Sequence, residues 1–427
     1  MSLLLYSRIA VSSGSRGGVS ASTLCQTRKE KKEEGTTVRQ PRVVIVGAGI
    51  VGLSTAYSLL TQGVEHVTIL EQETVDHPRG TSHGISRLLR FEYGPDIFYS
   101  RMVRMSLSRW KRLEQVSQRT LYTRTGLLVL GNEGDNFTQP SYQAMLEMQL
   151  PTERLSRQHC KQRFPQFTAS DSDVITYNAE AGILHASTCL RTLKELVISL
   201  GGTIHESCRV THLSHDSHLR PVRIHTSTGD ELSAERVVLA TGPWVHRLLA
   251  DLQLPVRLTR QYLLYFAGLP PSSFGIHAFP SFFTSDLYGF PFHPTSNNDY
   301  GPYWLKAASH TFGMPIDPDD ILPPDEQVIA HVAKKLRSLL PALRNAHLVQ
   351  VDSCVYDVSP DEGFILDRIP HDPRIVFATG LTGHGFKFGP LLGELLSSMI
   401  CETPPPVGLE HFQLARFSHR QQSTFVA

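Results

Sequence analysis

The sequence predicts an α/β fold in which a Rossmann-like domain is interleaved with a second domain built on a mixed sheet. Residues 42–46 form a short apolar, β-branched run that enters the turn GAGIVG and then a helical stretch, which is the pattern of a strand buried in a parallel sheet. Two later apolar runs, residues 236–242 and 374–380, also stop at a glycine. Between these runs lie stretches rich in aromatic residues, proline and alternating polarity, which are typical of a largely β domain.

The remaining elements follow in chain order. Residues 66–70 predict the second strand of the parallel sheet. Apolar side chains then recur at steps of four and three, at Tyr99, Val103, Leu107, Trp110 and Leu113, and predict one face of an amphipathic helix.

These elements predict the following domain boundaries. We expect residues 41–120, 176–246 and 346–400 to form the discontinuous nucleotide-binding domain, and residues 121–175 and 247–345 to form the substrate domain. Residues 1–40 are expected to be a flexible extension and residues 401–427 a tail.

Composition excludes several classes of protein. The 427 residues carry 41 Lys+Arg against 40 Asp+Glu, a formal net charge of +1 without the basic stripe of a nucleic-acid binder. No apolar run reaches the roughly 18 residues that span a bilayer, so we expect a soluble protein. The six cysteines are scattered, which argues against a disulfide scaffold, and no metal site is expected. No GxSxG, HExxH or P-loop motif supports a hydrolase or a P-loop enzyme.

The first 29 residues differ from the rest of the chain. They are rich in Ser and Gly, carry Arg8, Arg16 and Arg28, and contain no acidic residue, which fits an organelle transit peptide. An untargeted tail explains the same composition equally well.

A glycine motif gives the first chemical indication. Gly47, Gly49 and Gly52 form GxGxxG directly after a strand and at the start of a helix, a pattern that places a pyrophosphate at the helix N-terminus. Glu71 ends the next strand, 19 residues after Gly52, where a carboxylate can bind ribose hydroxyls. The motif predicts an ADP-containing dinucleotide without separating FAD from NAD.

Three segments separate the two cofactors by resemblance. RGTSHGISRLLRFEYG at residues 79–94, DSCVYDVSPDEGFILDRIP at 352–370 and GHGFKFG at 383–389 resemble the monomeric sarcosine oxidase and L-pipecolate oxidase family, which comprises D-amino-acid-oxidase-like FAD-dependent amine oxidases. The resemblance extends from about residue 41 to residue 400. It implies FAD as the cofactor and oxidation of the secondary amine of a small amino acid.

The resemblance also implies roles around the flavin. Cys354 matches the cysteine that holds FAD covalently, since a thiolate is the nucleophile that such a bond needs. His83 and Arg87 match residues that lie over the flavin ring, and Gly380, Gly383 and Gly385 form a turn whose N–H groups can face it. Lys306 matches the lysine that stabilises superoxide beside the flavin.

Other matched residues are implied to bind the substrate. Arg90 and Lys387 match the two carboxylate ligands, and Arg90 follows Arg87 by three residues, which would place both on one face of a helix. His310, Tyr288 and Tyr356 match residues that line the substrate pocket. Without the resemblance, the histidines and tyrosines would be read as ordinary core residues, the lysines and arginines as solvated surface, and Cys354 as a small buried side chain.

One position departs from the family. Asp357 stands where members of the family generally carry Thr. An extra carboxylate there would pair with a cation or favour a substrate with a second amine.

The sequence therefore predicts an FAD-dependent oxidase that passes a hydride to flavin and reduces O2 to H2O2, with sarcosine, L-pipecolate or L-proline as candidate substrates. A dehydrogenase of the same fold, passing electrons to a quinone or flavoprotein, and a non-catalytic FAD-containing assembly or binding protein are the alternatives. The resemblance implies a monomer in peroxisomes. The chain, however, ends in Phe425, Val426 and Ala427 without an SKL-type signal, and a functional transit peptide would direct it to mitochondria.

Overall fold

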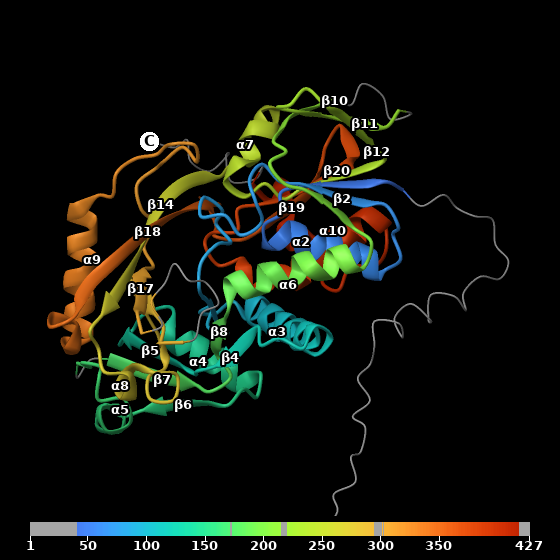
Figure 1. Cartoon of the computed structure of the whole chain (residues 1–427). Coiled ribbons are helices and arrows are strands. Elements are labelled where there is room, and N and C mark those ends of the chain that lie inside the picture. Colours follow the sequence, from blue (N-terminus) through green and yellow to red (C-terminus); the bar gives the residue numbers. More distant parts are fainter. Residues whose placement is uncertain (1–40, 171–172, 215–219, 294–300, 302, 418–427) are drawn as a thin grey trace, which may run out of the picture. The chain divides into compact units, whose positions relative to one another are not determined.

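The computed structural model describes residues 41–170, 173–214, 220–293, 301 and 303–417 (Figure 1). The candidate transit peptide and the last three residues lie outside this range. The described chain forms one compact unit from Pro41 onward. Within it, no helix has the length and apolar character needed to cross a bilayer, and no cluster of three His, Cys, Asp or Glu side chains is arranged to hold a metal ion.

The first sheet has six strands in the order β19-β20-β13-β1-β2-β9. Its members are β1 (Val43–Val46), β2 (Val67–Leu70), β9 (Thr203–His205), β13 (Arg236–Leu239), β19 (Ile365–Ile369) and β20 (Asp372–Thr379). All neighbouring pairs are parallel except β19 with β20. The predicted strands at residues 42–46, 66–70, 236–242 and 374–380 are therefore confirmed as members of one sheet.

Both faces of this sheet are covered, as the continuous apolar runs indicate. Val43 and Ile45 pack into the core beneath α2 (Ile50–Thr61), α6 (Ala186–Ser199) and α10 (Gly389–Cys401), which lie together in Figure 1. Val44 and Val46 face the opposite core, shared with a three-stranded sheet. That sheet consists of β10 (Val210–Ser214), β11 (Val222–Thr226) and β12 (Glu231–Ala234).

The second large sheet has eight strands in the order β18-β14-β17-β16-β15-β5-β7-β6. Its members are β5 (Leu127–Asn132), β6 (Thr152–Leu155), β7 (Asp173–Asn178), β14 (Arg257–Ala267), β15 (Ser281–Thr284), β16 (Leu287–Gly289), β17 (Leu305–Ser309) and β18 (His347–Val358). β15 runs parallel to β5 and the other pairs are antiparallel, so the sheet is mixed. Leu128, Leu264 and Phe282 face a core that they share with α9 (Glu326–Leu339). The residues next to them in the strands point to the opposite face of the sheet.

One predicted boundary differs from the strand pairing. Residue 346 was expected to begin the last segment of the nucleotide-binding domain, but β18 follows it and pairs with β14 along its length. The twelve-residue strand carrying Cys354 therefore belongs to the mixed sheet. Sequence periodicity cannot reveal this, because it does not say which partner a strand pairs with.

The remaining elements connect the sheets or cover them. A small sheet holds β3 (Arg87–Leu89), β8 (Gly182–Leu184) and β4 (Tyr122–Arg124). The other helices are α3 (Ile97–Ser117), α4 (Thr138–Glu147), α5 (Arg157–Arg163), α7 (Val245–Leu248) and α8 (Pro271–Phe274). Short 3₁₀ turns are η1 (Gly242–Trp244), η2 (Ala250–Leu252), η3 (Pro341–Arg344), η4 (Phe386–Phe388), η5 (Glu410–Phe412) and η6 (Leu414–Phe417). α3 contains the predicted amphipathic helix, and Tyr99, Val103, Leu107, Trp110 and Leu113 are all buried on it.

Candidate active site

A cavity of about 490 Å³ opens at the carboxyl end of β1. In open α/β sheets, ligands bind at this end of the strands. The predicted site residues that line it are Gly47, Gly49, Glu71, His83, Arg87, Tyr356, Gly383 and Gly385.

The turn between β1 and α2 has the form that a pyrophosphate requires. Gly47 has φ +102° and lies so close to Ala240 that a Cβ would overlap its carbonyl oxygen. A Cβ at Gly52 would overlap the carbonyl oxygen of Gly47, so this glycine permits close packing of strand and helix without lining the cavity. Ser82 Oγ accepts a hydrogen bond from Ile50 N at 3.1 Å in the first turn of α2. These residues fit the pyrophosphate of a dinucleotide.

Glu71 closes the same end of the cavity. Its buried carboxylate accepts hydrogen bonds from Ala48 N at 2.7 Å and from Glu73 N at 3.0 Å. These bonds hold the carboxylate beside the glycine turn, at the place where a ribose would meet it.

His83, in the segment before β3, and Arg87, the first residue of β3, both line the cavity. His83 Nδ1 lies 2.9 Å from the carbonyl oxygen of Asp76 and 3.0 Å from its carboxylate, both acceptors, so Nδ1 carries a hydrogen. The guanidinium of Arg87 donates to the carbonyls of Thr81, His83 and Ser86. The chain thus fixes this cation at the cavity wall.

The expectation that Arg87 and Arg90 share a helical face is wrong. Residues Arg87–Leu89 form strand β3, paired with β8. In an extended segment, side chains three positions apart point in opposite directions. Arg87 packs over Phe386 and Arg90 over Tyr93 and Phe283, yet both reach the second cavity described below.

The second cavity, of about 60 Å³, adjoins the first. Arg87, Tyr356, Gly383 and Phe386 line both, so these residues mark the junction. The other predicted residues around the smaller cavity are Arg90, Tyr288, Lys306, His310, Cys354 and Lys387. The structure therefore brings residues from distant parts of the sequence to one place; of the predicted set, only Gly52 and Gly380 line neither cavity.

Arg90 and Lys387 are two buried cations at the smaller cavity. Their residues are 6% and 3% exposed, and Arg90 Nη1 has no hydrogen-bond partner among the described residues. Lys387 Nζ donates to the carbonyl of His384 at 3.0 Å. Burial, followed by the nearby charge of Arg90, lowers the pKa of Lys387 well below its usual range. A bound anion would relieve both the desolvation and the repulsion.

Lys306 lies on β17, whose neighbouring residues Leu305 and Ala307 face the outer core. Strand alternation therefore turns Lys306 inward, where its Nζ donates to the carbonyl of Ser86 at 3.0 Å. Burial and then the charge of Arg87 lower its pKa to about 7.

Cys354 lies two residues before Tyr356 on β18 and lines the smaller cavity, whereas Tyr356 lines both cavities. Its thiol is free. Burial raises the pKa of Cys354, while the charges of Arg87 and Lys306 oppose this shift. These two cations would favour the thiolate that a covalent bond requires.

Tyr288, Tyr356 and His310 complete the wall. The two tyrosine hydroxyls are 3.5 Å apart, and burial raises the pKa of Tyr288 to about 12. Burial and the charges of Arg90 and Lys387 lower the pKa of His310 to about 3, so its ring is neutral at neutral pH. All three are therefore uncharged polar groups beside the two cations.

Asp357 follows Tyr356 but lines the larger cavity and not the smaller one. Its carboxylate accepts from Thr379 Oγ1 at 3.2 Å and Leu381 N at 3.3 Å, and burial raises its pKa to about 6. No cation in the described chain forms an ion pair with it. Neither interpretation made from the sequence fits this position; Asp357 instead joins β18 to the turn after β20.

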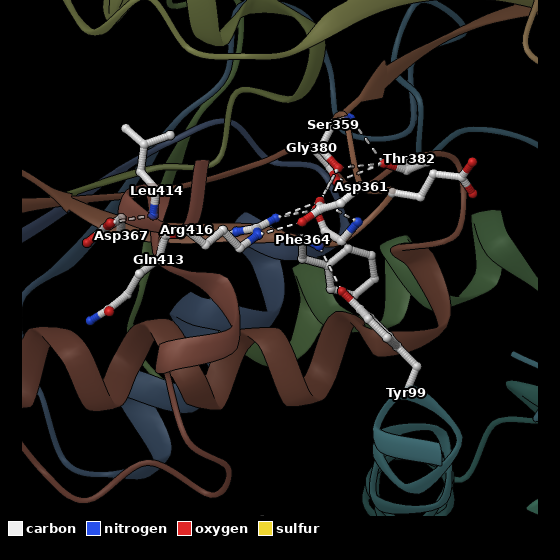
Figure 2. Close-up of polar contacts among 12 residues, drawn as sticks. Tyr99, Ser359, Asp361, Phe364, Asp367, Gly380, Thr382, Gln413, Leu414 and Arg416 are labelled. Carbon is white, nitrogen blue, oxygen red and sulfur yellow. Dashed lines mark hydrogen bonds and ion pairs between the residues drawn. The ribbon is translucent and has the colours of Figure 1, made fainter. Parts of the chain in front are cut away.

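The turn after β20 is also held by hydrogen bonds to the loop that follows β18 (Figure 2). Thr382 has φ +48°, which is unusual for a β-branched residue, and its hydroxyl accepts from Ser359 N at 3.3 Å and donates to Gly380 O at 3.0 Å. Asp361, in the same loop as Ser359, pairs with Arg416 at 2.9 Å. The C-terminal residues to 417, expected to be a tail, are thus bonded to the loop that holds the site turn.

Sequence reasoning missed several residues. Ser82, His384 and Phe386 line the cavities, and all three stand inside segments that carry the resemblance. Arg90 and Lys387 lie over the ring of Tyr93, which stands inside the segment at residues 79–94 but received no role from the resemblance.

A dinucleotide-type site at a GxGxxG turn, joined to a small cavity with two buried basic side chains, is the arrangement expected of a dinucleotide-dependent oxidoreductase. The chain belongs to the DAO family of FAD-dependent oxidoreductases, which its sequence matches over residues 42–399. It is 34% identical to the peroxisomal sarcosine oxidase of Mus musculus over 386 residues, covering 88% of this chain and 96% of the relative. It is 30% identical to the N-methyl-L-tryptophan oxidase of Yersinia pestis (strain Pestoides F), covering 88% and 99%.

Solved structures agree on the fold. The L-proline dehydrogenase of P. horikoshii matches with a TM-score of 0.75 at 19% identity, covering 89% of this chain and 98% of that one. The mixed α/β fold is therefore confirmed, and the protein is an FAD-dependent amine oxidoreductase by its relatives.

Proposed function

We propose that the protein oxidises the secondary amine of a small amino acid, of the sarcosine, L-pipecolate or L-proline type, with FAD as hydride acceptor and O2 as the final acceptor. The observation that carries this proposal is the pair of buried cations, Arg90 and Lys387, at a cavity of only about 60 Å³ beside the cofactor cavity. Sarcosine is named as the substrate of the mouse relative, which supports this substrate class.

The chain's own residues have distinct roles in this proposal. Arg90 and Lys387 bind the substrate carboxylate, which places the amine end toward the junction of the cavities. His310 and the two tyrosines are uncharged, so they offer no negative charge that would stabilise a protonated amine. The neutral form of the amine can therefore bind beside them. Bound FAD supplies the redox chemistry by accepting a hydride. Lys306 then stabilises negative charge on O2 as electrons reach it.

Release of H2O2 tests this function. The FAD-loaded protein is expected to form H2O2 with at least one N-methyl or cyclic amino acid in a panel. Reduction without reoxidation by air would favour the dehydrogenase alternative, for which the fold of the L-proline dehydrogenase is a precedent. Absence of both reduction and peroxide would favour the non-catalytic alternative.

We further propose that FAD is bound covalently through Cys354. The thiol lines the smaller cavity near Arg87 and Tyr356, which line both cavities, and the charges of Arg87 and Lys306 act on it. A flavin bonded to sulfur stays with the protein when acid precipitates it, whereas a flavin held by noncovalent contacts is released.

Replacing this thiol gives a direct prediction. Yellow colour should stay with acid-precipitated, washed protein and be lost in Cys354→Ser, because an alkoxide is far less available than a thiolate at neutral pH. Cys208→Ser is the matched control, since Cys208 is free and also lines the cofactor cavity. A colourless pellet from the unaltered protein, or loss of colour in the control alone, contradicts the tether.

We also propose that the two large sheets have different roles. The six-stranded sheet would hold the nucleotide, and the mixed sheet would supply the substrate side with Lys306, Tyr288 and Cys354.

We propose a monomer, and a peroxisomal location in keeping with the name of the mouse relative.

A further inference from the structure

Tyr93 lies beneath both cations of the smaller cavity. Its ring centroid is 4.6 Å from Arg90 Cζ and 5.3 Å from Lys387 Nζ. The face of an aromatic ring carries partial negative charge, so it attracts a cation without neutralising it. The two cations repel each other in a buried place, and the same ring is in a position to offset part of that repulsion for both.

Two hydrogen bonds fix the orientation of this ring. Its hydroxyl lies 3.1 Å from His384 Nδ1, and His384 Nε2 lies 3.1 Å from the carbonyl oxygen of Glu362. A carbonyl only accepts, so Nε2 carries the hydrogen of the histidine. Burial, followed by the charges of Lys387 and Arg90, lowers the pKa of His384 well below its usual range and keeps the ring neutral. Nδ1 therefore accepts the hydroxyl hydrogen of Tyr93.

The carbonyl that begins this chain of bonds is itself held in place. Glu362 has φ +59° and lies in the loop where Ser359 Oγ donates to Gly363 O at 2.7 Å. Arg416 bonds to Asp361 and to Gly363 O in the same loop (Figure 2). The fixed loop thus orients the ring of His384, and His384 in turn orients the ring of Tyr93. Donation by the hydroxyl also raises the electron density of the phenol ring, which strengthens its attraction for cations.

We propose that Tyr93 and His384 are positioning residues of the carboxylate site: His384 holds the Tyr93 ring, and the ring keeps Arg90 and Lys387 charged and aimed at the cavity. This inference rests on the proposed function, since it assigns a support to the same carboxylate site. Neither residue needs to touch the reacting atoms for this role.

Binding of acetate and of acetamide to the FAD-loaded protein, followed by flavin absorbance, tests the proposal. The two probes have nearly the same shape and differ in charge. Tyr93→Leu removes the ring and should raise the acetate Kd about 30-fold, whereas Tyr93→Phe keeps the ring, loses the hydrogen bond and should raise it about 3-fold. The acetamide Kd should change less than about 2-fold in both, because an uncharged ligand gains little from the cations.

A double-mutant cycle separates positioning from general damage. His384→Leu should raise the acetate Kd about as much as Tyr93→Phe, and the double variant no more than either, since both changes remove one bond. Tyr99→Phe is the matched control: Tyr99 stacks on Tyr93 with ring centroids 5.3 Å apart but lies over neither cation. Its acetate Kd should stay within about 2-fold.

Two results overturn the inference in different ways. If the unaltered protein binds acetate well and Tyr93→Leu leaves its Kd unchanged, or if acetate and acetamide weaken equally, the positioning role fails while the carboxylate site stands. If the unaltered protein binds acetate no better than acetamide, the carboxylate site of the proposed function fails, and the positioning role fails with it.

Discussion

Lys306→Met is expected to slow reoxidation of the reduced flavin by O2 about 100- to 1000-fold, which is the range for removing one fixed electrostatic group from an active site. Reduction of the flavin by substrate should slow less than about 10-fold, because Lys306 bonds to Ser86 O and packs over Phe290 and is not one of the two side chains assigned to the substrate carboxylate. Stopped-flow measurement of the two half-reactions checks this. Met keeps the length of the side chain, so the packing of the buried strand changes little.

The pH dependence of flavin reoxidation is a second test of the role of Lys306. The pKa of Lys306 is lowered to about 7, so the cation is present at lower pH and is lost as the pH rises through that value. Reoxidation in the unaltered protein should therefore slow as pH rises, and Lys306→Met should remove this dependence. Lys334→Met, at an exposed position on α9, should leave both half-reactions unchanged. Equal slowing of both half-reactions in Lys306→Met would contradict the assigned role.

Arg90→Ala is expected to lower kcat/KM about 100- to 1000-fold for the amino acid substrate. Truncating one member of a buried charge pair costs about 2–5 kcal/mol, and the carboxylate would also face Lys387 alone. The loss should be much smaller for the amide of the same substrate, whose uncharged group gains little from Arg90. Steady-state kinetics with both substrates measures the difference.

A second arginine provides the control for this prediction. Arg163 also packs on a tyrosine, with Cζ 4.1 Å from the ring of Tyr177, but it pairs with Glu153 and lines neither cavity. Arg163→Ala should leave kcat/KM unchanged for both substrates. If Arg90→Ala weakens the acid and the amide to the same degree, Arg90 shapes the pocket and does not bind the carboxylate.

Much of the nucleotide-binding half was predictable because its signals are local. A β-branched run, a glycine turn and an amphipathic helix each depend on residues near one another, and the structure confirms the four parallel-sheet strands and the helix at Tyr99 to Leu113. The motifs that resemble those of the family also identified residues that lie around the two cavities.

The errors arose where a pattern has no unique local interpretation. The three-residue spacing of Arg87 and Arg90 suits a helix, but the segment pairs with β8 as a strand. For Asp357 the sequence offers a cation partner or a substrate with a second amine, whereas its side chain lines the cofactor cavity and accepts hydrogen bonds from Thr379 and Leu381. Neighbouring residues on a strand point to opposite faces, so adjacency in sequence does not mean a shared site.

The sequence alone determined the family, the cofactor class and the chemical types of the site residues, because these depend on residue identity and short-range spacing. Only the tertiary structure decided that Arg90 and Lys387 meet over the ring of Tyr93 and that Lys306 and Cys354 line the same small cavity. Arg90 and Lys387 come from distant parts of the sequence, and strand pairing and burial, rather than local propensity, set these contacts and lower the pKa values of Lys306 and Lys387.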